Sequence, residues 1–230
     1  MEDILIISCI FGKKFNKTYK APLTKNCVFF TNNKELKDEI INNGWTFFYI
    51  DFNLTNDIVV SSLQSKYIKF LVFLKDFPEF NKFSKILYLD HKFNVLDIHV
   101  NKLLNIHKNH PEKLVIIRGT PKNKTSIYQE IEDAKYQERY LKNMKETVVF
   151  IEEKVQQYRL NSNVRISNTG IIFYNIMNSA IFEMLNDIYD SCLKLQQPEC
   201  QIFWALYSQK YLDYIKQIEF NDVNPVWKLP

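Results

Sequence analysis

"KILYLDHKFNVLD", residues 85–97, starts as an apolar run and becomes polar at one point. Its first part, KILYLD (85–90), is rich in the branched and aromatic side chains that favour strands, and it is too short for a helix. A continuously apolar run of this length is typical of a strand buried on both faces, as in a parallel sheet covered by helices. Three ionisable residues, Asp90, His91 and Lys92, then stand at the carboxyl end of that strand.

The rest of the chain alternates similar short runs with helical patterns. The other predicted strands are DILIISC (3–9), NCVFFT (26–31), WTFFYI (45–50), KLVIIR (113–118) and SNTGIIFYN (167–175). Apolar spacing predicts helices over 33–44, 59–77, 98–109, 125–160 and 179–195, and Pro198 suits the first position of a final helix. This alternation predicts an α/β fold with a Rossmann-like, mostly parallel central sheet flanked by helices, as a single domain over residues 1–230.

Composition narrows the class of protein. The chain has 230 residues, 46% of them hydrophobic, which suits one well-buried core. Its net charge of +4 is spread along the chain, so we expect anionic small-molecule ligands and no nucleic acid. No stretch has the length of a membrane span or the pattern of a signal peptide, so we expect a cytoplasmic protein with reduced cysteines. The Asn, Lys, Ile and Phe bias is typical of an AT-rich genome, viral or bacterial.

The polar residues at the end of strand 85–90 are the first candidates for chemistry, because such sheets bind ligands beyond the carboxyl ends of their strands. Asp90 is either a solvated turn or cap residue, or a ligand for a divalent metal or a diphosphate. In the second case Lys92 would neutralise phosphate charge, and His91 would bind the metal or donate a hydrogen bond to a leaving phosphate.

A strand that closes on "LD" and a second polar residue resembles the Asp-x-Asp region of glycosyltransferases of the GT-A fold. In those enzymes the motif holds Mn²⁺ or Mg²⁺ against the diphosphate of a nucleotide-sugar. The chain also resembles a family known as a domain of unknown function, whose plant members are Golgi glycosyltransferase-like proteins linked to pectin and mucilage. The stretches that carry this resemblance are ISCIFGKKFN (7–16), CVFFTNN (27–33), NGWTFFYI (43–50), KYIKF (66–70), ILYLDHKFNV (86–95), SIYQEIEDAKYQERY (126–140) and ECQIFW (199–204).

Three departures from the pattern of that family stand out. The glycine of its Asp-Gly-Lys strand is His91 here, and no second aspartate follows Asp90 at the Asp-x-Asp spacing. The aspartate that ends its Phe-Thr-Asp segment is Asn32, and the aspartate of its Arg-Asp-Gln segment is Cys200.

The resemblance implies a GT-A-like glycosyltransferase, a hexosyl- or pentosyltransferase, that moves a sugar from a nucleoside-diphosphate sugar to a hydroxyl of a glycan, protein or lipid-linked acceptor. Residues 1–118 would bind the nucleotide and 119–230 the sugar and acceptor, with a divalent metal on Asp90. The implied donor-binding residues are Ile10, Phe11, Gly12, Thr31, Asn32, Lys66, Lys69, Asp90, His91, Lys92, Arg118, Asn168, Thr169 and Gly170. Glu199 would be the base that takes the acceptor's proton, with Gln201 beside it.

Several of these residues have a plainer interpretation. Lys66 and Lys69 fit a solvated helix face, and Arg118 fits a structural ion pair with Glu130 or Asp133. The Asn168–Gly170 segment fits a β-bulge, and Glu199 fits the start of a helix.

Two other functions stay open. His99, His107 and His110 lie on or just after one predicted helix, and with Asp90 and His91 they suggest a metal-dependent hydrolase. The 15% aromatic content is compatible with a non-catalytic carbohydrate-binding module, although buried strands account for many aromatics.

Overall fold

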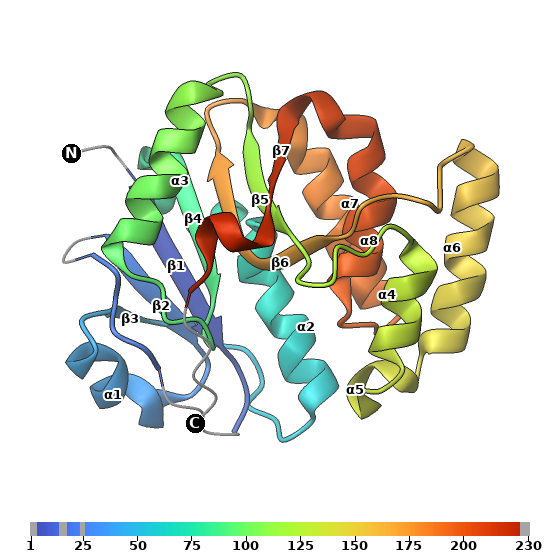
Figure 1. Ribbon diagram of the computed structural model, residues 1–230. Helices are drawn as coiled ribbons and strands as arrows, with labels where there is room; N and C mark the ends of the chain where they lie inside the picture. The colour runs from blue at the N-terminus through green and yellow to red at the C-terminus, as the bar shows by residue number, and fades with distance from the viewer. Residues whose placement is uncertain (1–3, 14–17, 24–25, 226–230) are drawn as a thin grey trace.

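A central sheet organises the molecule. The computed structural model describes residues 4–13, 18–23 and 26–225. In this part the chain forms a seven-stranded sheet in the order β3-β2-β1-β4-β6-β5-β7 (Figure 1). The strands are β1 (Ile4–Ile10), β2 (Cys27–Thr31), β3 (Thr46–Tyr49), β4 (Lys85–Asp90), β5 (Val115–Gly119), β6 (Ser167–Asn175) and β7 (Ile215–Ile218).

Strand direction places several chain segments at one edge of this sheet. β1 runs parallel to β2 and β4, β2 to β3, and β5 to β7, whereas β6 runs antiparallel to both β4 and β5. The end of β1, the end of β4 and the beginning of β6 therefore lie at the same edge. The predicted single α/β domain with a mostly parallel sheet is confirmed.

Helices cover both faces of the sheet (Figure 1). One face packs against α2 (Ile58–Lys69), α4 (Ile127–Ala134), α6 (Met144–Tyr158), α7 (Phe182–Lys194) and α8 (Cys200–Tyr207). The other packs against α1 (Lys37–Asn42) and α3 (Asp97–Asn109). Because strand side chains alternate, Leu5 and Ile7 of β1 enter the first core, and Ile4 and Ile6 enter the second.

Two predicted helices are shorter than their patterns suggest. Helix 59–77 ends at Lys69, because Leu71 adopts a left-handed conformation with φ 60°, and short 3₁₀ turns follow. The 125–160 segment is divided into α4, α5 (Glu138–Leu141) and α6. Gln137, extended at φ −111° and ψ 116°, separates the first two, and Asn143, at φ −112° and ψ 19°, separates the last two. Apolar spacing continued through these breaks, so the sequence pattern did not reveal them.

The carboxyl-terminal third holds two further differences. Pro198 precedes α8 rather than opening it, since Glu199 is the N-cap and the helix begins at Cys200. Strand β7, with the sequence IKQI, was not predicted, because half of its residues are polar. Among the described helices, none has the length and apolar character needed to cross a membrane.

Candidate functional site

A cavity of about 810 Å³ opens at the sheet edge where β1 and β4 end and β6 begins. Its walls come from these strands, from α2, from the segment 120–140 and from the start of α8. Twelve of the predicted site residues line it: Ile10, Phe11, Lys66, Lys69, Asp90, His91, Lys92, Asn168, Thr169, Gly170, Glu199 and Gln201. The predicted residues outside the lining are Gly12, Thr31, Asn32 and Arg118.

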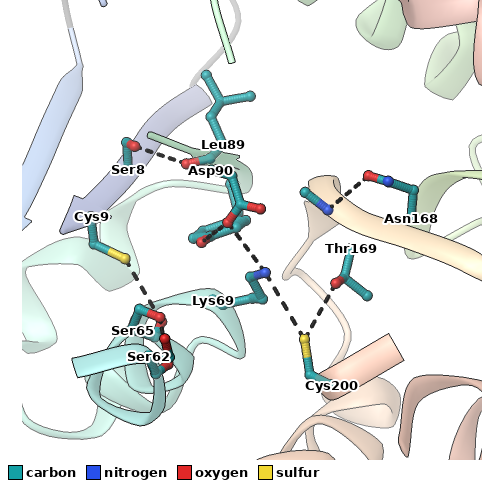
Figure 2. A network of polar contacts seen from close by, with 12 residues as sticks. Ser8, Cys9, Ser62, Ser65, Lys69, Leu89, Asp90, Asn168, Thr169 and Cys200 are labelled. Carbon is teal, nitrogen blue, oxygen red and sulfur yellow. Dashed lines mark hydrogen bonds and ion pairs between the residues drawn. The ribbon is translucent and has the colours of Figure 1, made fainter. Parts of the chain in front are cut away.

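Asp90 and Lys69 form an ion pair on the cavity wall (Figure 2). The Lys69 ammonium lies 3.3 Å from Asp90 Oδ1, and the two side chains are 4% and 23% exposed. The hydroxyl of Tyr88 donates to the same carboxylate oxygen over 2.7 Å. Lys69 Nζ also lies 5.0 Å from the centre of the Tyr88 ring. Three groups from β4 and α2 are thereby held in a fixed arrangement.

Mutual electrostatics keep both members of this pair charged. Burial by itself raises the pKa of Asp90, but the Lys69 ammonium, with a smaller contribution from Lys92, holds that pKa well below its usual range. Burial by itself lowers the pKa of Lys69, but the Asp90 carboxylate brings it above its usual value. At neutral pH, Asp90 is therefore a carboxylate and Lys69 an ammonium.

Lys66 lies one turn before Lys69 on α2 and is also buried, at 7% exposed. It lines the cavity, but within the described residues no hydrogen bond or ion pair joins its ammonium to another side chain. The solvated helix face expected for Lys66 and Lys69 is therefore wrong. Both stems lie under the edge of the sheet, where the end of α2 packs against β1.

Cys200 continues the polar network across the cavity (Figure 2). Its Sγ lies 4.0 Å from Lys69 Nζ and 3.3 Å from the Thr169 hydroxyl. Beside it, Gly170 packs so tightly that an added Cβ would come within 2.3 Å of the Phe93 ring. The network thus links β4, α2, α8 and the beginning of β6 around one space.

A second polar cluster lies at the α4 side of the cavity. Glu130 Oε2 pairs with Lys124 at 2.6 Å, and Glu130 Oε1 accepts a hydrogen bond from the Gln201 side-chain amide at 2.7 Å. Gln201 in turn accepts from the backbone of Thr169, and its own backbone N–H donates to Glu199 Oε1. Burial and the nearby Glu199 raise the pKa of Glu130. The second half of the chain therefore contributes three carboxylates to the cavity lining, those of Glu130, Asp133 and Glu199.

Asn32 and Gly12 lie outside the cavity lining and contact each other next to it. Asn32 Oδ1 accepts from the Gly12 backbone, and its amide donates to the backbone carbonyl of Asn53 over 3.0 Å. Gly12 has φ +93°, and an added Cβ would meet both Ser61 Oγ and Thr55 O at 2.9 Å. These residues hold the loop that presents Ile10 and Phe11. The predicted contact of Asn32 and Gly12 with the nucleotide stays a prediction.

Arg118 occupies a different environment from the one predicted. Its guanidinium is sandwiched between Phe93 and Phe220, with its carbon 4.8 Å and 4.5 Å from the ring centres. It donates to the carbonyl of Val223 and to Asn168 Oδ1. The expected pairing with Glu130 or Asp133 is wrong, because both of those carboxylates contact Lys124 instead.

The histidines do not form a cluster at the cavity. His91 lines it, and burial lowers the pKa of its ring, which keeps the ring neutral at pH 7. His99 accepts a hydrogen bond from the Leu96 backbone, His107 packs against Phe173, and His110 lies near Glu112. None of these last three lines the cavity, so the structure does not favour the hydrolase.

Sequence reasoning missed several lining residues, notably Cys9, Tyr88, Lys124 and Tyr140. For Tyr88 a signal existed: the two-residue period of a strand places its side chain on the same face as that of Asp90. Glu130 was considered only as a partner for Arg118. The other residues reach the cavity through packing between distant segments, for which one sequence carries no signal.

The residues around Asp90 do not form a carboxylate-rich metal site. Mg²⁺ and Mn²⁺ prefer oxygen ligands and are commonly held by one or two carboxylates together with substrate phosphates. Asp90 supplies a single carboxylate, and its Oδ1 already contacts Tyr88 and Lys69. In the part of the chain that the structure describes, no three His, Cys, Asp or Glu side chains are grouped to hold a metal. The metal on Asp90 stays a prediction.

Comparisons by sequence find no relative. No family model matches the chain, and no curated protein matches it. The resemblance to the plant domain-of-unknown-function family therefore has no support from these comparisons.

Comparison of structures shows the fold. Mouse xyloside xylosyltransferase 1 in its apo form is 10% identical, with a TM-score of 0.53 over 95% of this chain and 86% of that one. Glucosyl-3-phosphoglycerate synthase from Mycobacterium tuberculosis, in complex with phosphoglyceric acid, is 8% identical, with a TM-score of 0.48 over 100% and 73%. A glycosyltransferase involved in glycosylation of the major capsid of PBCV-1 is 14% identical, with a TM-score of 0.42 over 94% and 81%. The likeness to the mouse enzyme shows a shared fold, of the GT-A type, and at 10% identity it carries the fold alone.

Proposed function

We propose that this protein is a glycosyltransferase that moves a sugar from a nucleoside-diphosphate sugar to a hydroxyl of a glycan, protein or lipid-linked acceptor. The observation that carries the proposal is that one cavity offers both ammonium groups and carboxylates. Lys66 and Lys69 line it from α2, and Glu199 lines it from the start of α8. Such a site suits an anionic leaving group at one place and a proton acceptor at another.

The donor would lie along the end of β1 and the beginning of β6. Ile10 and Phe11 offer apolar surface for the base, and Lys66, Lys69 and Lys92 line the same cavity with positive charge for the diphosphate. Thr169 and Gly170 would border the donor sugar. A Cβ at Gly170 would meet the Phe93 ring at 2.3 Å, so the wall has no room for a side chain at this position.

The acceptor would approach from the side of α4 and α8. In a transfer with inversion, a Glu199 oxygen takes the proton of the acceptor hydroxyl while the hydroxyl oxygen bonds to the anomeric carbon. The bond from that carbon to the diphosphate oxygen breaks in the same step, and the diphosphate leaves with the electron pair. Gln201 orients Glu130 and Glu199, because its side chain contacts the first and its backbone contacts the second.

Release of nucleoside diphosphate from a panel of nucleotide-sugars tests the proposal. The panel combines uridine, guanosine, cytidine and adenosine donors with mixed soluble acceptors, and the released diphosphate is measured by chromatography. We expect one donor to be consumed, and Glu199→Gln to consume it about 10²-fold more slowly or worse. If no donor is consumed but glycans bind, the chain is a binding module and the proposal fails.

A further inference from the structure

We propose that Lys66 and Lys69 together bind the diphosphate of the donor in the place where a divalent metal would otherwise bind, so that donor binding needs no metal. This inference rests on the proposed function and names the groups that carry the charge of the leaving diphosphate.

Lys66 offers the cavity a positive charge that no protein group neutralises. Its side chain is 7% exposed and lines the cavity, and no hydrogen bond or ion pair joins its ammonium to another of the described residues. The ammonium opens into the cavity, because among the described residues the one buried side-chain nitrogen or oxygen without a hydrogen-bond partner is Arg118 Nε. Its charge acts on Asp90 and Cys9 only at longer range. An anion that enters the cavity would supply the partner that the protein does not.

The second step concerns Lys69 and Asp90. Lys69 Nζ lies 3.3 Å from Asp90 Oδ1, so the Asp90 carboxylate already binds a cation, the Lys69 ammonium. A divalent ion on the same carboxylate would face the repulsion of Lys69 and of Lys66 one turn away. Lys92 takes the position at which an Asp-x-Asp motif carries its second carboxylate, so it adds a third positive charge. This donor set suits an anion better than a second cation.

The third step is preorganisation. Residues three apart on a helix lie on one face, and Lys66 and Lys69 occupy the last turn of α2. The backbone carbonyl of Lys69 accepts a hydrogen bond from the buried Tyr174 hydroxyl at 2.9 Å, which fixes this end of the helix to β6. Figure 2 shows Lys69 extended between Asp90 and Cys200, toward the beginning of β6. The Lys69 ammonium and the helix turn that carries both lysines are therefore placed before a ligand arrives, which reduces the ordering cost of binding.

Binding of pyrophosphate and of nucleoside diphosphates, measured by titration calorimetry in EDTA and again in Mn²⁺ or Mg²⁺, tests the inference. Pyrophosphate serves as a probe that does not depend on the base. We expect binding in EDTA, with at most a small change on addition of metal. Lys66→Met should weaken it at least about tenfold, since a hydrogen bond to a charged group is lost. Lys66→Arg should restore much of it, and Lys75→Met, at an exposed lysine of the following turn, should leave it unchanged.

A second readout separates this role from a structural one. Because no protein group pairs with the Lys66 ammonium, Lys66→Met should leave the melting temperature of the ligand-free protein about unchanged while it weakens anion binding. Unchanged anion binding in Lys66→Met would overturn the inference, whatever the melting temperature. Binding that appears only with Mn²⁺ or Mg²⁺ would also overturn it, but would leave the proposed transferase standing. If neither pyrophosphate nor any nucleoside diphosphate binds under either condition, the proposed function fails as well.

Discussion

At the scale of single residues, Asp90 and Lys69 form an ion pair on the cavity wall at 3.3 Å. A buried ion pair adds little to stability compared with an apolar pair, but removal of one partner leaves the other charge buried and uncompensated. Asp90 also accepts from Tyr88, so the loss of its charge affects three groups that are packed together. The same argument predicts the direction of the pH dependence.

Asp90→Asn should lower the free energy of unfolding by about 3–5 kcal/mol at pH 7, because Lys69 keeps its charge without a counter-ion. Urea unfolding measures this change. The double variant Lys69→Met with Asp90→Asn is the control and should recover part of the loss. A single variant as stable as the wild type would contradict the role of the pair.

The pH dependence of this difference follows from the lowered pKa of Asp90. A carboxyl group with a lowered pKa in the folded state stabilises the protein above its unfolded pKa of about 3.9 and loses that contribution as the pH falls through the folded value. The stability gap between wild type and Asp90→Asn should therefore be constant near neutrality and narrow below about pH 4. Unfolding curves collected across that range check the sign.

Gly12 and Gly44 form a matched pair for testing the loop behind the cavity. Both have positive φ, at +93° and +83°, but an added Cβ at Gly12 meets Ser61 and Thr55, whereas at Gly44 it meets only Ala21 at 3.7 Å. Gly44→Ala should cost about 1 kcal/mol from backbone strain. Gly12→Ala should cost clearly more and also weaken nucleotide binding through Phe11. Equal costs in denaturant unfolding would show that the contacts at Gly12 relax freely.

At the scale of elements, the first residues of α8 and its N-cap have both a structural role and a role in the proposed reaction. Glu199 caps the helix through its Oε1, and Cys200 and Gln201 follow inside the cavity. The helix-start interpretation of Glu199 is therefore confirmed, and the proposed base role has to coexist with it. A substitution that keeps the cap but removes the charge can separate the two roles.

Glu199→Gln and Glu199→Ala provide that separation. Glutamine keeps an oxygen that can accept from the Gln201 backbone, so the melting temperature should barely change. Alanine should cost about 1 kcal/mol through loss of the cap. Both should slow sugar transfer about 10²-fold or more, because neither can take a proton. Full activity in Glu199→Gln would move the base role to another group, with Glu130 the nearest candidate.

At the scale of the whole molecule, the sequence predicted the parts whose signal is local. Strand β4 and its polar end were predicted, because a continuous apolar run is a clear signal of a strand buried on both faces. Strand β7 was not predicted, because half of its residues are polar. The breaks in 59–77 and 125–160 were missed because the apolar spacing of the sequence continues through Leu71 and Gln137, where the backbone leaves the helical conformation. The site itself depends on contacts such as Lys69 with Cys200, which lie 131 residues apart, so the burial and pairing of its charges could not be predicted.

Thermal unfolding in the presence of uridine, guanosine, cytidine and adenosine diphosphates is the measurement that tests the central claim most directly. A ligand that binds only the folded state adds about 2.7 kcal/mol at 100 times its dissociation constant, which is readily seen as a rise in melting temperature. The account predicts a rise with one of these nucleotides that persists in Lys75→Met and is reduced in Lys66→Met. No rise with any nucleotide would contradict the claim that this cavity binds a nucleotide-sugar, whereas a rise that Lys66→Met leaves unchanged would contradict only the role given to Lys66.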